Sequence, residues 1–236
     1  MTSLRLLDKY RQLLENGTYD GQDWTPFHRR PLSRYDTFRR AFELFPSGGR
    51  IVELGTIRSF VHGGLPACNT DDQSAWTPDE PANWDWGAGC FSRVAAECLA
   101  DLGPAITTID AAISHLERCR VITAPFANRF TYVCQDSRDF LREVAGQIDL
   151  LYLDTGDITP IEPTAQLQLE EARIIVERDL VRPGGVLLID DVQNQTPRAH
   201  GEPSLLGKAK YSLPYLLSHG FTADMSEYQS LLVRNP

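Results

Sequence analysis

Three acidic residues come directly after strongly apolar runs of the sequence. Asp154 follows the run 148–153, and the pair Asp190 and Asp191 follows the run 185–189. Carboxylates are costly inside buried strands, but at the carboxyl ends of neighbouring parallel strands they point into the crevice where such sheets bind ligands. Carboxylate oxygens in such a place suit Mg²⁺. The pattern predicts a ligand site with these three residues as metal ligands, and helix capping or loop solvation is the alternative.

Alternating helices and strands would bring these acids to one edge of a sheet. Short apolar runs predict strands at 50–55, 104–110, 130–134, 148–153 and 186–189, with residues 182–185 as the turn into the last of them. Apolar residues at helical spacing predict helices at 91–102, 112–122, 137–145 and 165–180. This alternation implies right-handed crossovers and a Rossmann-like, doubly wound α/β fold. After a helix at 212–219, the strands 221–225 and 228–233 lie too close for a crossover helix, so the mostly parallel seven-stranded sheet ends in an antiparallel strand.

Two segments stand outside this alternation. Amphipathic stretches at 3–15 and 33–45 predict helices before the first strand. Residues 59–87 are rich in Pro, Gly, Asp and Asn and contain Trp76, Trp84 and Trp86. Long loops are typical of functional lids, and clustered tryptophans favour an ordered one that covers an acceptor, although a cap that only packs on the sheet edge is the alternative. We therefore expect one domain, 1–236, with a helical cap 1–45, a core 50–234 and an insertion 59–87.

Composition limits the partners. The chain has 236 residues, a formal charge of −9 and 42% hydrophobic residues, which is typical of a soluble domain. The negative charge opposes attraction to polyanions, so we expect no nucleic-acid partner. No apolar run approaches the roughly 20 residues of a membrane span, and the start turns polar too early for a signal peptide, so we expect a cytoplasmic protein without a membrane partner. Assembly into a homo-oligomer is left open.

The order of elements and the strand-end residues resemble class I S-adenosylmethionine-dependent methyltransferases over roughly residues 50–234. The run 52–56 is similar to that family's first motif, in which a glycine lets the backbone approach the cofactor and an acid helps position its amino-acid portion. The resemblance implies that Asp110 pairs with the ribose hydroxyls, because a carboxylate can accept from both; a plain helix cap is the alternative. The implied cofactor residues are Glu53, Gly55, Thr56, Asp110, Ala111, Asp136, Ser137 and Asp154.

The first cofactor loop departs from the family's pattern. Ile57 stands where many members have a second glycine, and the insertion 59–87 separates the first motif from its helix. Gly87 and Gly89, just before the helix at 91, could instead supply the close backbone approach to the cofactor.

Asp154 followed by Asp190 and Asp191 narrows the resemblance to metal-dependent O-methyltransferases of the catechol, caffeoyl-coenzyme A and macrolide-sugar types. It implies S-adenosylmethionine and Mg²⁺ as cofactors, the metal lowering the pKa of an acceptor hydroxyl and orienting its oxygen toward the methyl group. Asp157 stands where the catechol group often has a catalytic lysine, so the base is left between His200 and Asp157. The implied activity is O-methylation of a small hydroxylated molecule, such as a secondary metabolite or a sugar.

Two other functions share this fold. A nicotinamide-dependent oxidoreductase would require a Gly-x-Gly-x-x-Gly turn directly after the first strand, and the sequence has none there. A non-catalytic, methyltransferase-like binding protein is the second alternative, because a fold does not fix a function.

Basic residues cluster near the predicted N-terminal helices, at positions 29, 30, 34, 39 and 40, all of them arginine. They could grip an anionic acceptor. In an acidic chain, however, a salt-bridged helix surface is the expected role.

Overall fold

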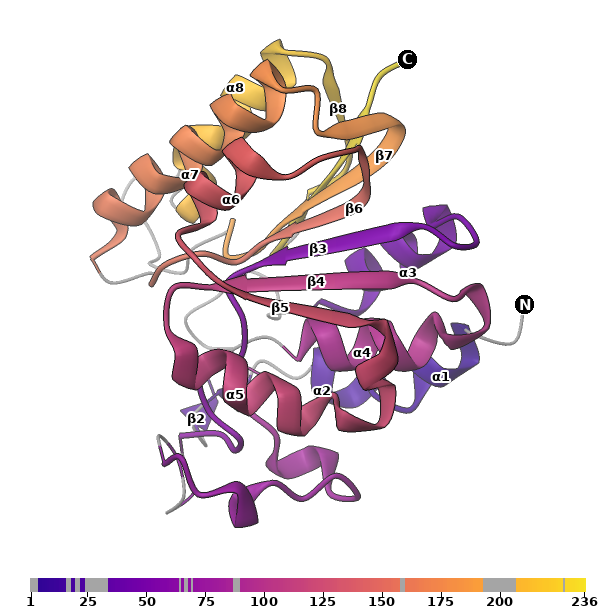
Figure 1. Cartoon of the computed structure of the whole chain (residues 1–236), viewed down its shortest axis with the longest axis vertical. Helices are drawn as coiled ribbons and strands as arrows, with labels where there is room; N and C mark the ends of the chain where they lie inside the picture. Colours follow the sequence, from indigo (N-terminus) through magenta and orange to yellow (C-terminus); the bar gives the residue numbers. More distant parts are fainter. Residues whose placement is uncertain are drawn as a thin grey trace.

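The protein is described by a computed structural model that covers residues 4–15, 18–19, 22–23, 34–63, 65, 68, 70–86, 90–157, 160–192, 207–226 and 228–236. A seven-stranded sheet forms its centre, in the order β5-β4-β3-β6-β7-β9-β8 (Figure 1). Its strands are β3 (Arg50–Leu54), β4 (Ala105–Asp110), β5 (Phe130–Cys134), β6 (Ile148–Leu153), β7 (Val181–Ile189), β8 (Phe221–Ser226) and β9 (Ser230–Arg234). Strands β3 to β7 are parallel and β9 runs antiparallel to both of its neighbours. The predicted Rossmann-like, doubly wound fold with an antiparallel last strand is confirmed.

The strand order reverses between β3 and β6. From β3 the chain moves outward to β4 and β5, and then returns to the other side of β3 to build β6 and β7. Ligands of open α/β sheets bind at such a switch point, beyond the carboxyl ends of the strands. The register aligns Leu54 with both Ile109 and Leu153, and Leu153 with Ile189. The residues that follow these positions in the four central strands therefore emerge side by side at one edge of the sheet.

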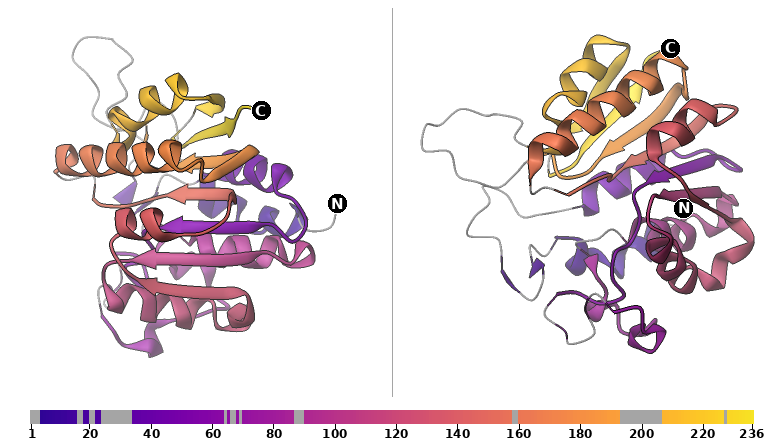
Figure 2. Two further views of the ribbon diagram at one scale, coloured as in Figure 1. Left: turned by 45° about the horizontal axis from the view of Figure 1, so that its top comes forward. Right: turned by 60° about the vertical axis from the view of Figure 1, so that its left-hand side comes forward.

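Two hydrophobic cores lie on the two faces of the sheet. Ile51 and Tyr152 belong to one core and Val52 and Leu151 to the other, because successive side chains of a strand point to opposite faces. The first face is covered by α1 (Leu4–Asp8), α2 (Arg11–Glu15), α3 (Tyr35–Leu44), α4 (Phe91–Cys98) and α5 (Ile113–Ile122), and the second by α6 (Ser137–Glu143), α7 (Ile161–Glu177) and α8 (Ser212–Ser218) (Figure 2). Both faces are thus closed, and the carboxyl edge is left for a site.

Short elements complete the described chain. The strands β1 (Thr18–Tyr19) and β2 (Gln22–Asp23) form a separate antiparallel pair. The 3₁₀ turns are η2 (Gln73–Ala75), η3 (Pro81–Asn83), η5 (Ala100–Leu102), η6 (Ala124–Arg129) and η7 (Lys208–Lys210). Across the described residues, no helix has the length and apolar character needed to span a membrane.

Four predicted elements have wrong boundaries. The helix expected at 165–180 is α7, which begins at Ile161 and ends at Glu177. The helix expected at 3–15 is split into α1 and α2 at Tyr10, because this buried side chain turns inward and its hydroxyl donates to Glu97 Oε2 at 2.7 Å. The helix expected at 91–102 ends at Cys98 and continues as η5. Residues 182–185 lie within β7, because Val181 already pairs with Ile148. The register then shifts before Val186 pairs with Leu150, and Gly184 lies in this irregular stretch with φ +71°.

The tryptophans of the insertion pack inward. Trp84 and Trp86 are buried, and both rings lie within 5.6 Å of the Tyr10 ring, centroid to centroid. Their indole N–H groups donate to the carbonyl oxygens of Thr77 and Pro81 at 3.0 and 2.7 Å. These contacts join the insertion to the N-terminal helices, which favours the structural cap over a cover for an acceptor.

The arginines near the N-terminal helices separate into two groups. Arg39 and Arg40 form surface ion pairs, with Glu43 and Asp224 respectively. Arg34 is buried instead, so the expected surface role is wrong for that residue. Residues 29 and 30 lie outside the described part of the chain.

Candidate active site

Gly55 and Asp154 bring the two central strands together at the switch point. Gly55 has φ +82°, in the left-handed region that favours glycine. A Cβ atom built on Gly55 would lie 2.5 Å from the carbonyl oxygen of Asp154, so no side chain fits there without displacing the backbone. The glycine predicted for close approach to a cofactor is thus also required by the approach of the neighbouring strand.

Asp110 continues β4 beside Gly55. Its Oδ1 accepts the N–H of Ala112 at 2.8 Å, and its Oδ2 accepts the N–H of Thr56 and a bond from the His115 ring, both at 3.1 Å. Burial disfavours the charged carboxylate, but these hydrogen bonds outweigh burial and lower the pKa of Asp110. The residue is therefore an anion, and three of its roughly four lone-pair sites are used within the protein.

Glu53 lies beneath this edge. Its side chain is buried, and its Oε2 accepts hydrogen bonds from the hydroxyls of Thr56, Ser92 and Thr108 at 3.2, 2.5 and 2.6 Å. Burial raises the pKa of Glu53 to about 7, against the opposing effect of those hydroxyls. Thr56 thus connects the two predicted cofactor acids, since its N–H binds Asp110 and its hydroxyl binds Glu53.

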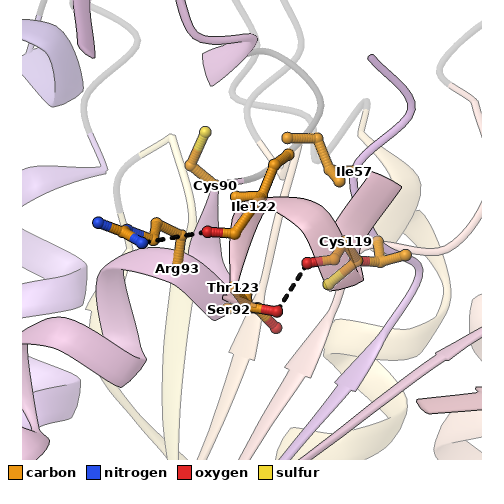
Figure 3. Close-up of a pocket in the computed structure, with 8 residues that line it drawn as sticks. Ile57, Cys90, Ser92, Arg93, Cys119, Ile122 and Thr123 are labelled. Atoms are coloured by element: carbon orange, nitrogen blue, oxygen red, sulfur yellow. Dashed lines mark hydrogen bonds between the residues drawn. The ribbon is translucent and has the colours of Figure 1, made fainter. Parts of the chain in front are cut away.

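A narrow hollow opens beside Thr56. Thr56 lines it together with Ile57, Cys90 and Cys119, which are labelled in Figure 3. It lies between the end of β3 and the helices α4 and α5. As the side chains stand, the hollow has no room for a water molecule, so it is not by itself a cofactor pocket.

The predicted adenine-side residues have structural partners. Asp136 caps α6 by accepting the N–H of Arg138 at 2.9 Å and pairs with its guanidinium, also at 2.9 Å. The Ser137 hydroxyl donates to Glu171, a buried carboxylate. Ala111 is exposed and lies between Asp110 and α5. These contacts neither require nor prevent a cofactor, and the cofactor roles of these residues remain predictions.

Asp154, Asp190 and Asp191 converge as predicted. Carboxylate oxygens of the three residues lie within 4.8 Å of one another. The convergence follows from the register, because Asp154 continues β6 directly beside Asp190 at the end of β7. Asp191 has φ +53°, uncommon for a residue other than glycine, and this turn places its side chain beside the other two.

Asp190 is fully buried and already bound. The Arg34 guanidinium donates to it from Nη2 at 2.7 Å and from Nε at 3.2 Å. Tyr152 OH and Gln229 Nε2 add bonds of 2.9 and 3.0 Å. Both Asp190 oxygens are therefore occupied by protein donors, and its charge is balanced by Arg34.

Lys208 lies between the other two carboxylates. Its Nζ is 2.8 Å from Asp154 Oδ1 and 2.8 Å from Asp191 Oδ2, and its side chain is 4% exposed. Burial alone would lower the pKa of Lys208, but the surrounding carboxylates outweigh it and raise the pKa, so the lysine is an ammonium. The same ammonium, together with Arg34, lowers the pKa of Asp191 despite the opposing effect of burial.

Residues 86–192 match the family Methyltransf_24, described as a methyltransferase domain. Among solved structures, the SAH-bound methyltransferase PaMTH1 from Podospora anserina is similar, with a TM-score of 0.55 and 13% identity over 98% of this chain and 88% of that one. A candidate caffeoyl-CoA O-methyltransferase from Staphylococcus aureus has a TM-score of 0.52 and 14% identity, over 100% of this chain and 93% of that one. The chain therefore has the fold of these methyltransferases. No curated protein matches it in sequence.

The carboxylate cluster, as it stands, leaves little room for the Mg²⁺ that the sequence predicts. Mg²⁺ requires carboxylate oxygens about 2.0–2.1 Å from the ion and keeps several waters. Both oxygens of Asp190 are taken by protein donors, and the Lys208 ammonium lies where a cation would bridge Asp154 and Asp191. The residues converge as the metal prediction requires, but in this arrangement their charges are met by Arg34 and Lys208. The donor set does not fit a divalent ion without displacement of Lys208.

S-adenosylmethionine fits the part of the sheet edge around Asp110 better than Mg²⁺ fits the carboxylate cluster. Asp110 is anionic and has a lone-pair site left for one ribose hydroxyl, and a second would be freed if His115 turned away. Gly55 and Thr56 present backbone at the same edge, beside the hollow. Gly87, Gly89 and His200 lie outside the described residues.

The second base candidate, Asp157, is 64% exposed and forms an ion pair with Arg58. Among the described residues, no hydrogen bond or ion pair links Asp157 to the cluster of Asp154, Asp190 and Asp191. The choice between His200 and Asp157 remains a prediction.

The sequence interpretation missed Lys208 as a site residue and missed the pairing of Arg34 with Asp190. By sequence, Arg34 belongs with its basic neighbours, and Lys208 follows a polar loop in which His200 is the candidate base. One signal was available for both residues: three carboxylates predicted to converge need positive charge nearby. The sequence does not say which of its 23 basic residues supplies that charge.

Proposed function

We propose that this protein is an S-adenosylmethionine-dependent O-methyltransferase that acts in the cytoplasm on a hydroxyl of a small molecule, such as a secondary metabolite or a sugar. One observation carries the proposal: carboxylates from the ends of β6 and β7 converge within 4.8 Å at the same sheet edge that holds Gly55 and Asp110. A methyl donor and an acceptor hydroxyl can meet there.

The cofactor half of the site rests on Asp110. S-adenosylmethionine supplies, when bound, a methyl group on a positively charged sulfur. Asp110 would accept a ribose hydroxyl, and Gly55 and Thr56 would lie along the cofactor with backbone rather than side chains. The fold of the chain and the SAH-bound state of the similar Podospora anserina structure support this assignment.

The acceptor half lies beside Asp154 and Asp191, whose carboxylates are 13% exposed and so reach the surface of the site. They would accept hydrogen bonds from acceptor hydroxyls and hold the attacking oxygen. His200 or Asp157 would take the proton that the hydroxyl loses. Mg²⁺ is not part of the proposal, because Lys208 and Arg34 already meet the charges of the cluster.

Calorimetric titration tests the cofactor. We expect S-adenosylmethionine and S-adenosylhomocysteine to bind with dissociation constants well below millimolar, and NAD⁺ not to bind. Binding of NAD⁺ alone would favour the oxidoreductase alternative, and binding of none of the three at millimolar concentration would dismiss enzymatic methyl transfer.

Transfer of a labelled methyl group tests the acceptor class. We expect label to appear in hydroxylated small molecules, but not in matched amines or in RNA, whose backbone charge the acidic chain repels. Substitution of His200 and of Asp157 by alanine, one at a time, identifies the base as the residue whose loss lowers turnover with cofactor binding unchanged. Methylation of amines alone would contradict the O-methyl assignment.

A further inference from the structure

We propose that Lys208 is a permanent cation of this site: its ammonium takes the place of a divalent ion between Asp154 and Asp191, so the protein binds no metal there, and loss of the ammonium creates a divalent-cation site. The inference concerns metal binding and stability and does not depend on the acceptor. Only its corollary, that chelators leave turnover unchanged, rests on the proposed function.

The position of the ammonium is the first argument. Lys208 Nζ lies 2.8 Å from one oxygen of Asp154 and 2.8 Å from one oxygen of Asp191. A cation that bridges two carboxylates stands between them in this way. The lysine side chain is 4% exposed while each carboxylate is 13% exposed, so the positive charge lies deeper than the negative charges that it serves. An ion entering from solvent would meet two carboxylates that the ammonium already bridges.

The backbone holds Lys208 in this place. Its N–H donates to the carbonyl oxygen of Asp191 at 3.1 Å, which holds the Lys208 backbone beside that residue. A Cβ atom on Gly207 would lie 1.8 Å from that carbonyl oxygen, which means that the two segments pack backbone against backbone. The lysine therefore starts from a fixed point beside Asp191, and its side chain needs only to extend to reach Asp154.

The charge of the site also disfavours a metal. Arg34 and Lys208 already give the three carboxyl groups two positive charges. A divalent ion would add two more and would lie beside the buried ammonium. Without the ammonium, the three carboxyl groups would face Arg34 alone, and the two oxygens that held Lys208 would be left without their cation. A small hydrated divalent ion then becomes the best available partner.

The experiment compares wild type with Lys208→Ala, using Mn²⁺ as the probe in calorimetry and Mg²⁺ with EDTA in thermal unfolding. We expect wild type to bind no Mn²⁺ at millimolar concentration and to melt at the same temperature with Mg²⁺ or with EDTA. We expect Lys208→Ala to melt lower, to bind Mn²⁺ at least tenfold more tightly than wild type, and to regain melting temperature when Mg²⁺ is added.

Two controls locate the effect. Lys210→Ala removes a neighbouring lysine of the same 3₁₀ turn, which pairs with Glu162 at the surface, and should show no response to divalent ions. The double variant Lys208→Ala with Asp191→Asn should lose the Mn²⁺ binding of the single variant. A merely structural role for Lys208 would lower the melting temperature without any dependence on divalent ions.

Saturable Mn²⁺ binding by wild type that Asp154→Asn abolishes would overturn the proposal, and so would a folded Lys208→Ala that gains no affinity for Mn²⁺. If Lys208→Ala does not fold, Lys208→Gln keeps the length and polarity of the chain without its charge and faces the same two criteria. S-adenosylmethionine binding, measured separately, tells a failure of this proposal from a failure of the proposed function.

Discussion

Arg34 and Asp190 are 156 residues apart in the sequence and form an ion pair in which the two side chains are 5% and 0% exposed. Arg34 Nη2 lies 2.7 Å from Asp190 Oδ2, and its guanidinium also stacks over the Tyr228 ring at 4.8 Å. The pair fastens the segment before α3 to the end of β7. It therefore ties the N-terminal helices to the acidic edge of the sheet.

Arg34→Met should destabilise the protein strongly. The substitution leaves the Asp190 carboxylate buried without its cation, which costs about 3–5 kcal/mol in comparable cases. Urea unfolding measures the loss, and Arg40→Met is the matched control because the Arg40–Asp224 pair is partly exposed and should contribute about 1 kcal/mol or less. Equal losses in the two variants would show that the buried pair has no special weight.

Gly55→Ala should be worse than Gly103→Ala. Both glycines have positive φ, +82° and +62°. A Cβ atom on Gly55 would lie 2.5 Å from the Asp154 carbonyl oxygen, whereas a Cβ atom on Gly103 would have no neighbouring atom within 4 Å. The shared backbone cost is about 1–2 kcal/mol, and the crowding at Gly55 should add about 1–3 kcal/mol. Thermal unfolding of the two variants measures the difference. Equal stability would mean that the two strands separate there at little cost.

Asp110→Asn should weaken cofactor binding at least tenfold, a loss of about 1.4 kcal/mol. An amide in place of the carboxylate removes the negative charge and directs N–H groups at donors that now bind Asp110. Calorimetric titration with S-adenosylmethionine measures the change. Asp139→Asn, at an exposed carboxylate of α6, is the control. Lower stability with unchanged affinity would reduce Asp110 to a helix cap.

Glu171→Gln should remove a pH dependence of stability. Burial raises the pKa of Glu171 to about 7, despite hydrogen bonds from Ser137 and Thr155. Between its ordinary pKa of about 4.3 and 7, the unfolded state releases this proton while the folded state keeps it. This residue's contribution to the free energy of unfolding therefore falls as pH rises through that window and is constant above it.

Glutamine mimics the protonated form, so Glu171→Gln should gain stability over wild type from pH 4 to pH 8, by up to about 4 kcal/mol. Urea unfolding at several pH values measures this difference. Glu170→Gln, at the preceding and exposed position of α7, should show no such trend. A difference from wild type that is the same at every pH would refute the assignment.

Most of the fold could be predicted from local patterns. Apolar runs of five or six residues located β3 to β6 to within a residue or two, because buried parallel strands need continuous apolar sequence. The errors came where tertiary contacts override local pattern. Tyr10 interrupts a helical stretch where its side chain packs against two tryptophans of the insertion, and Val181 enters β7 through its pairing with Ile148.

At the site, local sequence pattern is enough to identify the acids at the sheet edge. Asp110 ends a strand, Asp154 and Asp190 each follow one, and parallel strands that share a register must bring such residues together. The cations that balance their charge are visible only in the folded chain. Arg34 and Lys208 belong to other segments of the chain, and folding alone brings them to these acids. No local sequence pattern therefore indicates the pairings. An ion pair depends on distance in space, whereas a strand depends on its neighbours in sequence.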